Sequence, residues 1–291
     1  MQMTGWLIVN AFYVNQRLLE QYDLLEWAFA MRGVHLERHT NASLRFGIGE
    51  YPRDLPDFVI AWDKDVLLIR QLEQFGVRVF NGARATAVAD DKAHMYLAFA
   101  DARLPIPRTY FAPMTYSNIG YPEEALAFVD KIAERIGYPI VIKEACSSYG
   151  MGVHLACDRD QAIGLLPKLY GNIVFQQFIA ESAGTDVRIY VVGDRCVCSA
   201  LRRNTRDFRS NIVAGGTMTA YNASEQMQQI AVAAARSIGA DFAGVDLLLG
   251  RKGPLVCEVN TCAHFGTLYH VLGVNVADEI VDYVMKNVYE L

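Results

Sequence analysis

Apolar and polar residues alternate with two different periods over residues 1–88. Short apolar runs predict strands, whereas apolar residues repeated every three or four positions predict amphipathic helices. We expect strands at residues 7–9, 34–38, 58–62 and 77–80, and helices near 15–31 and 65–75. Strand and helix in alternation indicate a small parallel α/β sheet. This part has no Gly-x-Gly-x-x-Gly turn, so nothing in it supports dinucleotide binding.

Some polar side chains of this region could face a ligand. Tyr13, Asn15, Arg17 and the segment 45–51 could reach a molecule bound at the carboxyl ends of the strands. A role at the protein surface is the favoured interpretation for them.

The pattern changes in residues 89–172. A helix is predicted at 90–102, and Pro105 and Pro107 end it. A strand at 108–111 and a helix at 123–136 follow, and then two strands at 138–145 and 153–157.

Lys143 and the loop 147–152 between these two strands form a candidate phosphate site. The loop offers backbone N–H groups and hydroxyls, which can hold a phosphate chain without a helix. The small residues concerned are Ser147, Ser148, Gly150 and Gly152. A lysine buried beside them would need an anion. A flexible hairpin connection remains the alternative, and the chain has no Walker-type Gly-x-x-x-x-Gly-Lys-Ser/Thr motif.

Residues 173–291 combine strands with a basic segment. We expect a strand at 173–179, a hairpin of strands 187–192 and 195–200, and helices at 223–238 and 276–288. A loop rich in arginine, 202–211, includes Arg202, Arg209 and Asn211. Arginine forks match carboxylate and phosphate oxygens. Anion binding and a solvated basic loop remain equally plausible interpretations.

A second hairpin, 241–262, carries acidic residues. If its turn is centred on Lys252, Asp246 lies opposite Glu258, and Asn260 lies opposite Gly244 on the same face. The other face is expected to hold Leu247, Leu249, Leu255, Cys257 and Val259. Such oxygen ligands suit Mg²⁺ that bridges substrate phosphates. Spacing alone leaves two solvated acids on an exposed sheet face as an equal alternative.

Composition limits the class of protein. The 291 residues are 52% hydrophobic and 20% charged, which fits a soluble globular protein of two or three domains. The net charge of −5 argues against nonspecific binding to nucleic acid or anionic membranes. We expect a first strand rather than a signal peptide, no membrane span, and reduced thiols, because the six cysteines form no Cys-x-x-Cys pair. A cytoplasmic location follows as an expectation.

Several of the segments described above, with further short motifs, follow one another along the chain. They are Lys143 with its loop, 176–179, 186–188, 202–203, 207–211, 215–216, 243–246 and 258–260. In this order they resemble the motifs of ATP-grasp ligases, and most of all the RimK-type ligases, which add glutamate or another amino acid to a carboxylate. The resemblance runs from about residue 90 to 288. It implies an α/β ATP-grasp fold with a Rossmann-like N-terminal domain at 1–88, a central subdomain at 89–172 and a C-terminal subdomain at 173–291.

The resemblance also implies roles for individual residues. Lys92 and Lys143 would bind ATP phosphates, the loop with Ser147, Ser148, Gly150 and Gly152 would cover them, and Asp186 would meet the ribose. Gln176, Gln177, Phe178 and Ile179 would form the adenine strand. Arg202 and Arg209, with Asn211, would serve the γ-phosphate or the activated carboxylate. Asp246, Glu258 and Asn260 would hold two Mg²⁺ ions, which Mn²⁺ could replace.

Two departures from the family pattern affect specificity. Relatives usually have Gln-Glu where this chain has Gln176-Gln177, and a neutral amide can accept from adenine or donate to a keto group. Relatives commonly continue with Ser-Pro-Gly where this chain has Thr261-Cys-Ala-His-Phe-Gly266, so the acceptor is expected to differ. His264 could act as a general base, although a structural role is the favoured interpretation.

The function expected from the resemblance is that of an ATP-dependent carboxylate–amine ligase. Its substrates would be a carboxylate and an amine, and its products an amide, ADP and phosphate. A kinase acting on a hydroxyl and a noncatalytic nucleotide-binding module are the alternatives. We expect no nucleic-acid or membrane partner, and a homo-oligomer remains an option.

Overall fold

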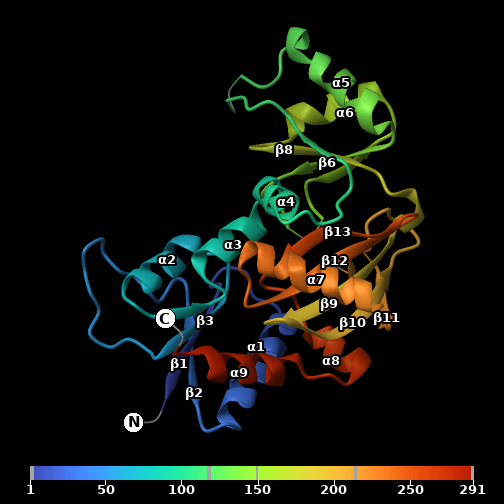
Figure 1. Ribbon diagram of the computed structural model, residues 1–291. Helices are drawn as coiled ribbons and strands as arrows, with labels where there is room; N and C mark the ends of the chain where they lie inside the picture. Colours follow the sequence, from blue (N-terminus) through green and yellow to red (C-terminus); the bar gives the residue numbers. More distant parts are fainter. Residues whose placement is uncertain (1–2, 117–118, 149, 213–214, 290–291) are drawn as a thin grey trace.

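The computed structural model describes residues 3–116, 119–148, 150–212 and 215–289. Its strands form three sheets of four, five and four strands. Figure 1 shows the N-terminal sheet at the lower left, the five-stranded sheet beside it, and the remaining sheet above both. Among the described residues, no helix is both long enough and apolar enough to cross a membrane. The six cysteines are free thiols, as predicted.

The N-terminal sheet is parallel and has the order β2-β1-β3-β4, which confirms the predicted α/β arrangement. Its strands are β1 (Thr4–Val9), β2 (His35–Thr40), β3 (Phe58–Trp62) and β4 (Arg78–Phe80). The predicted helices form as α1 (Gln16–Ala30) and α2 (Val66–Gln74). Asn15 and Asp65 cap them, and each side chain accepts an N–H from the first turn.

Two short helices connect this sheet to the rest of the chain. The sequence predicted a single helix at 90–102, but α3 (Ala83–Asp90) precedes α4 (Lys92–Asp101). Asp91 separates the two, because its side chain accepts from the N–H groups of Ala93 and His94 and so begins α4.

The upper sheet is antiparallel with the order β5-β8-β6-β7. It comprises β5 (Thr109–Phe111), β6 (Ile140–Glu144), β7 (Val153–Ala156) and β8 (Ile173–Gln177). The helices with it are η1 (Glu123–Ala125), α5 (Ala127–Ile136), α6 (Arg159–Leu165) and η2 (Leu166–Lys168). Since β8 pairs with β5 and β6, the boundary that we expected at 172/173 would cut this sheet. Long-range strand pairing, which local pattern does not reveal, places β8 here.

The five-stranded sheet has the order β11-β10-β9-β12-β13. Its strands are β9 (Thr185–Val192), β10 (Arg195–Arg203), β11 (Thr217–Ala220), β12 (Phe242–Gly250) and β13 (Gly253–Asn260). The helices of this part are η3 (Ala180–Ser182), α7 (Glu225–Ile238), α8 (Gly266–Leu272) and α9 (Val276–Asn287). The strand β11 and the helix α8 were not predicted. Arg202 and Arg203, expected in a loop, belong to β10.

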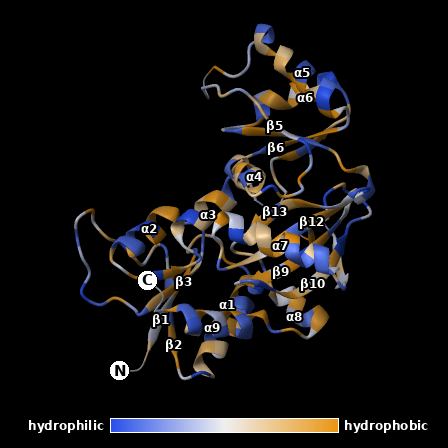
Figure 2. Ribbon diagram, viewed as in Figure 1, coloured by the Kyte–Doolittle hydropathy of each residue, from blue (hydrophilic) through white to orange (hydrophobic). Residues whose placement is uncertain are grey.

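One hydrophobic core joins the N-terminal sheet to the five-stranded sheet. Trp62 at the end of β3 stacks on Phe242 at the start of β12, with ring centroids 5.5 Å apart. A separate core on the other face of the five-stranded sheet includes α4 and α7. The upper sheet packs against α5 and α6 in a core of its own. Figure 2 shows hydrophobic and hydrophilic residues mixed along α5 and α9, as expected of helices that cover a sheet with one face.

Candidate active site

A cavity of about 670 Å³ lies where the three parts of the chain meet. Its walls come from the start of α1, from β6, β8 and the loop after β6, and from β9, β10, β12 and β13. The residues singled out in the sequence that line it are Lys92, Lys143, Ser147, Ser148, Gly150, Gln176, Gln177, Phe178, Ile179, Asp186, Arg202, Arg209, Asn211, Asp246, Glu258 and Asn260. The fold therefore brings segments as distant in sequence as those of Tyr13 and Asn260 into one site.

Gly152, the remaining small residue of the predicted phosphate loop, is not among the residues that line the cavity. Its φ is +66°, and a Cβ atom there would lie 2.5 Å from Oε2 of Glu144. The positive φ favours glycine, and a larger residue would also displace the Glu144 side chain. Tyr149, in the same loop, lies outside the described residues.

The β12–β13 hairpin has the predicted register near its acidic residues. Asp246 pairs with Glu258, and Gly244 pairs with Asn260. A bulge after Asp246 then shifts the pairing, so that Leu247 lies opposite Val256. As a result Val256 is in the core, whereas Cys257 lines the cavity. The predictions that Leu255 and Cys257 share the face of Leu247 were wrong, because the bulge exchanges the two faces.

Asp246 is held by two arginines. Arg188 donates Nε and Nη2 to its carboxylate at 2.5 and 2.7 Å, and Nη2 of Arg202 lies 2.7 Å from Oδ2. Burial by itself would raise the pKa of Asp246, but the charges of Arg188 and Arg202 lower it overall. Asp246 is therefore an anion whose oxygens are already oriented.

Arg202 also binds Asp186, through Nε at 2.7 Å and Nη2 at 2.5 Å. Ser210 donates its hydroxyl to the same carboxylate. Arg202 is 5% exposed and its guanidinium lies between two carboxylates, so its orientation is fixed.

Arg209 belongs to the predicted loop and lies nearer the surface. It forms an ion pair with Asp207 at 2.7 Å, and its Nη1 donates to the carbonyl oxygen of Gly150 at 2.6 Å. The five-stranded part of the chain thereby contacts the loop after β6.

Two buried lysines face the cavity from the opposite wall. Lys143 is 6% exposed and donates to Oε1 of Gln176 at 2.7 Å and to the Tyr96 hydroxyl at 3.1 Å. Lys92 is 5% exposed and donates to the carbonyl oxygen of Ser147 at 2.7 Å. Burial lowers the pKa of Lys92, and the positive charges of Lys143 and Lys64 lower it further. Positive charge therefore gathers around the loop after β6.

Some residues of this site had no role, or another favoured role, in the sequence analysis. Tyr13, Asn15 and Arg17 are exposed but also line the cavity, which fits the less favoured interpretation that they face a ligand. Arg188 and Lys64 also line it. For Lys64 the available signal was its position directly after the predicted strand 58–62, where a parallel sheet binds ligands.

Tyr96 was also missed, and it carries a hydroxyl into the site from α4. The hydroxyl lies 2.6 Å from the carbonyl oxygen of Cys257 and 3.2 Å from Oε1 of Gln176. Burial raises the pKa of Tyr96 to about 12. The tyrosine thus remains neutral and connects β8 with β13.

His264 lines the cavity next to α1. Its Nε2 lies 3.0 Å from the carbonyl oxygen of Arg17, and burial lowers its pKa. This contact gives the ring a structural partner at the edge of the site.

Comparisons with known proteins identify the family of this chain. The family model of the RimK-like ATP-grasp domain matches residues 89–284. A probable alpha-L-glutamate ligase of Haemophilus ducreyi is 33% identical over 246 residues, which is 82% of this chain and 76% of that protein. The chain therefore belongs to the RimK-like ATP-grasp family. It is an ATP-dependent ligase of the class that forms amide bonds.

Solved structures show the same fold. An ATP-grasp RimK domain protein of Sphaerobacter thermophilus superposes with a TM-score of 0.74 at 23% identity, over 96% of this chain and 98% of that one. A D-alanine–D-alanine ligase of Bacillus anthracis gives a TM-score of 0.74 at 14% identity, over 100% and 98% of the two chains. The resemblance found in the sequence is thereby confirmed, together with the ATP-grasp fold.

Proposed function

We propose that this ligase converts a carboxylate into an acyl phosphate and joins it to the amine of an amino acid, with glutamate as the first candidate. The observation that carries the proposal is the charge distribution of the cavity. Lys92 and Arg209 contact the loop after β6, and Lys143 lines the cavity from β6, while Glu258 and Asn260 line the same cavity from β13. Glutamate is suggested by the name of the Haemophilus ducreyi relative.

The nucleotide would lie between the upper and the five-stranded sheets. Gln176, Gln177, Phe178 and Ile179 would contact the base, while Lys92, Lys143 and the loop with Ser147, Ser148 and Gly150 would bind the phosphates. Asp186 would meet the ribose and also hold Arg202, to which it is already paired. Arg202, Arg209 and Asn211 would face the transferred phosphoryl group.

Asp246, Glu258 and Asn260 fit a magnesium site shared with phosphate oxygens. Their side chains line one cavity, and each offers hard oxygen ligands. Arg188 and Arg202 occupy three of the roughly four acceptor positions of the Asp246 carboxylate, which leaves about one for a metal. Within the described ranges, no three His, Cys, Asp or Glu side chains form a ready-made metal cage. Such a site suits Mg²⁺, which keeps water and phosphate ligands.

The chain's own residues account for most of the chemistry. A carboxylate is a poor electrophile because oxide would have to leave, so a phosphoryl group must first be transferred to it. The bond from the γ-phosphorus to the bridging oxygen breaks, and a bond to the carboxylate oxygen forms. The lysines and arginines keep the phosphates in line and balance their charge. Two bound Mg²⁺ ions, replaceable by Mn²⁺, would supply further charge neutralisation.

The amine nitrogen then attacks the acyl carbon. Inorganic phosphate leaves with one oxygen of the original carboxylate, and the nitrogen loses a proton. His264 and Arg17 border this end of the cavity. They are positioned to meet the acceptor or the amine.

Oxygen labelling tests the route. The purified chain is incubated with ATP, Mg²⁺, glutamate and a panel of ¹⁸O-carboxylate acceptors, and products are detected by mass spectrometry. We expect one ¹⁸O atom per turnover in inorganic phosphate, ADP, and an amide lighter by one water than its two substrates. AMP with pyrophosphate would instead indicate adenylation. A stable phosphorylated hydroxyl would identify a kinase, and nucleotide binding without turnover of any acceptor would favour a noncatalytic module.

The same assay measures nucleotide preference. Gln177 lines the cavity beside Gln176, and its side-chain amide can present either an acceptor or a donor. Comparing ATP with GTP shows whether this neutral pair still selects adenine.

A further inference from the structure

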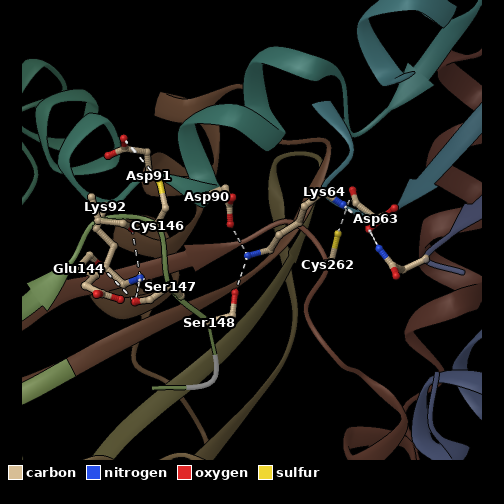
Figure 3. A network of polar contacts seen from close by, with 12 residues as sticks. Asp63, Lys64, Asp90, Asp91, Lys92, Glu144, Cys146, Ser147, Ser148 and Cys262 are labelled. Atoms are coloured by element: carbon tan, nitrogen blue, oxygen red, sulfur yellow. Dashed lines mark hydrogen bonds and ion pairs between the residues drawn. The ribbon is translucent and has the colours of Figure 1, made fainter. Parts of the chain in front are cut away.

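Lys64 connects the N-terminal sheet to the loop after β6. It stands directly beyond the carboxyl end of β3, and Figure 3 shows its ammonium between Asp90 and Ser148. Its Nζ lies 2.5 Å from Oδ1 of Asp90 and 2.9 Å from Oγ of Ser148. The distance in sequence between Lys64 and Ser148 is 84 residues, so only the folded state creates this contact.

The same loop is held from two further directions. Lys92 of α4 donates to the carbonyl oxygen and the hydroxyl of Ser147, at 2.7 and 3.2 Å. Arg209, from the five-stranded part, donates to the carbonyl oxygen of Gly150. Three cations from three parts of the chain therefore meet on one short loop.

Lys64 is also part of the charge distribution of the cavity. It lines the cavity together with Lys92 and Glu258. Burial works to lower the pKa of Lys64, but the hydrogen bond and the charge of Asp90 raise it overall, with smaller contributions from Cys262 and then Glu258. Lys64 is thus a stable cation on the side of the cavity that the N-terminal sheet contributes.

We propose that Lys64 is a positioning residue for the nucleotide phosphates. By donating to Ser148 it fixes the loop against the N-terminal sheet, so that the loop and this sheet are set in one arrangement around the phosphates. The proposal rests on the proposed function, in which this loop covers ATP. Lys92 and Lys143 would bind the phosphates directly, whereas Lys64 acts through the loop.

If Lys64 had a purely structural role, its loss would lower the free energy of unfolding. The side chains of Lys64 and Asp90 are 39% and 36% exposed, and ion pairs this exposed contribute little to the free energy of unfolding. Loss of Lys64 should consequently leave the fold intact and change the behaviour of the loop.

Nucleotide binding separates the two roles. Calorimetry with Mg²⁺ and ADP is run on the wild type, Lys64→Met, Lys64→Arg, Ser148→Ala and the double variant Lys64→Met/Ser148→Ala. We expect about tenfold weaker ADP binding for Lys64→Met, close to wild-type binding for Lys64→Arg, and no further loss in the double variant beyond the weaker single variant. Asp90→Asn is the matched control, because it keeps the donor to Ser148.

Proteolysis gives a second measurement. If Lys64 had a purely structural role, cleavage of the loop would not change at an unchanged melting temperature. Met151, in the loop, is 66% exposed and is a secondary site for chymotrypsin, which prefers aromatic residues. With ADP and Mg²⁺ present, the wild type and Lys64→Arg should resist cleavage after Met151, whereas Lys64→Met should be cut faster at an unchanged melting temperature.

The outcomes distinguish this inference from the proposed function. If the wild type binds no nucleotide, both fail. Wild-type affinity in Lys64→Met, or strictly additive losses in the double variant, would overturn the role of Lys64 alone. Should Lys64→Met not fold, the structural role is supported, and Ser148→Ala with normal ADP affinity and cleavage would confirm that our inference is wrong.

Discussion

The ammonium of Lys143 lies 2.7 Å from Oε1 of Gln176, on the neighbouring strand β8. A buried cation thus faces a neutral amide rather than a carboxylate. Its second partner, the Tyr96 hydroxyl, is neutral as well. The burial of this charge is only partly compensated by these partners, and an anionic ligand would complete the compensation.

Replacing Lys143 with methionine should therefore separate binding from folding. Methionine keeps most of the buried volume, and the Tyr96 hydroxyl remains 3.2 Å from Oε1 of Gln176. We expect ADP affinity to fall by at least about tenfold, while the free energy of unfolding of the ligand-free protein changes by less than about 1 kcal/mol or rises. Urea unfolding and calorimetry measure the two quantities.

The exposed Lys168→Met serves as the control and should change neither quantity. A loss of more than about 2 kcal/mol in Lys143→Met would instead make Lys143 a residue that stabilises the fold.

Glu258→Gln tests the proposed metal site. The change keeps the shape of the side chain and removes one negative charge opposite Asp246. If Glu258 holds Mg²⁺, turnover should fall by about 100-fold or more, and the Mg²⁺ concentration for half-maximal rate should rise. The melting temperature should stay close to that of the wild type. Steady-state kinetics at several Mg²⁺ concentrations provide the measurement.

Glu225→Gln, at the exposed start of α7, is the matched control. Near-normal turnover of Glu258→Gln at moderate Mg²⁺ would contradict the metal assignment.

The acidic hairpin shows how far local sequence reasoning can reach. Asp246 pairs with Glu258 as predicted, but the turn is centred between Arg251 and Lys252, since Gly250 pairs with Gly253. The bulge, which leaves Cys257 without an opposite residue, compensates for this difference. The bulge after Asp246 could not be foreseen, since it depends on how both strands pack against the core. Cys257 consequently faces the cavity, and its placement was predicted wrongly.

Contacts between distant segments were harder to predict. The Tyr96 hydroxyl reaches the carbonyl oxygen of Cys257, 161 residues away, and nothing near either residue signals this contact. The strand β8 joins the upper sheet for the same reason. By contrast, α1 and α2 were predicted almost to the residue from the spacing of their apolar residues, and the caps Asn15 and Asp65 that begin them are local as well.

Gly184 packs against the arginine-rich loop 202–211, and its replacement tests whether this contact holds the loop in place. Its φ is +64°, and a Cβ atom would lie 2.2 Å from the carbonyl oxygen of Asn204. Its N–H donates to the carbonyl oxygen of Phe208, next to Arg209. Gly184→Ala should lower the free energy of unfolding by at least about 2 kcal/mol and reduce turnover, because the segment must move.

Gly164→Ala is the control for this prediction. Gly164 lies in α6, has no positive φ, and no neighbouring atom lies within 4 Å of the added Cβ. Alanine there should stabilise the protein by about 0.5–1 kcal/mol and leave turnover unchanged. Equal effects of the two substitutions in urea unfolding would show that the close approach at Gly184 is unimportant.

The last prediction concerns Asp241, which joins the N-terminal sheet to the C-terminal part. Its Oδ1 accepts from Nη2 of Arg78 at 2.8 Å and from the Tyr283 hydroxyl at 3.1 Å. Burial raises the pKa of this carboxyl from 3.8 to about 6, although Arg78 and Tyr283 act in the opposite direction. The folded protein therefore binds this proton more tightly than the unfolded chain does.

The sign of the pH dependence follows from this difference. Between about pH 4 and pH 6 the folded state holds more protons, so its free energy of unfolding falls as the pH rises. A pKa shift of about two units contributes roughly 2–3 kcal/mol to the free energy of unfolding at low pH. This contribution is lost completely once the pH exceeds the pKa of Asp241 in the folded state. Asp241→Asn cannot titrate. The wild-type value minus the Asp241→Asn value should therefore decline from pH 4 to pH 6 and stay constant above pH 7.

Urea unfolding of both proteins from pH 4 to pH 8 measures this difference, and contributions from other groups cancel in it. Tyr283→Phe removes a donor that lowers the pKa of Asp241, so it should move the decline to higher pH. A difference that increases with pH would mean that Arg78 outweighs burial and that the pKa of Asp241 is depressed in the folded state. In that case the ion pair between Arg78 and Asp241 would stabilise the junction of the two sheets near neutral pH.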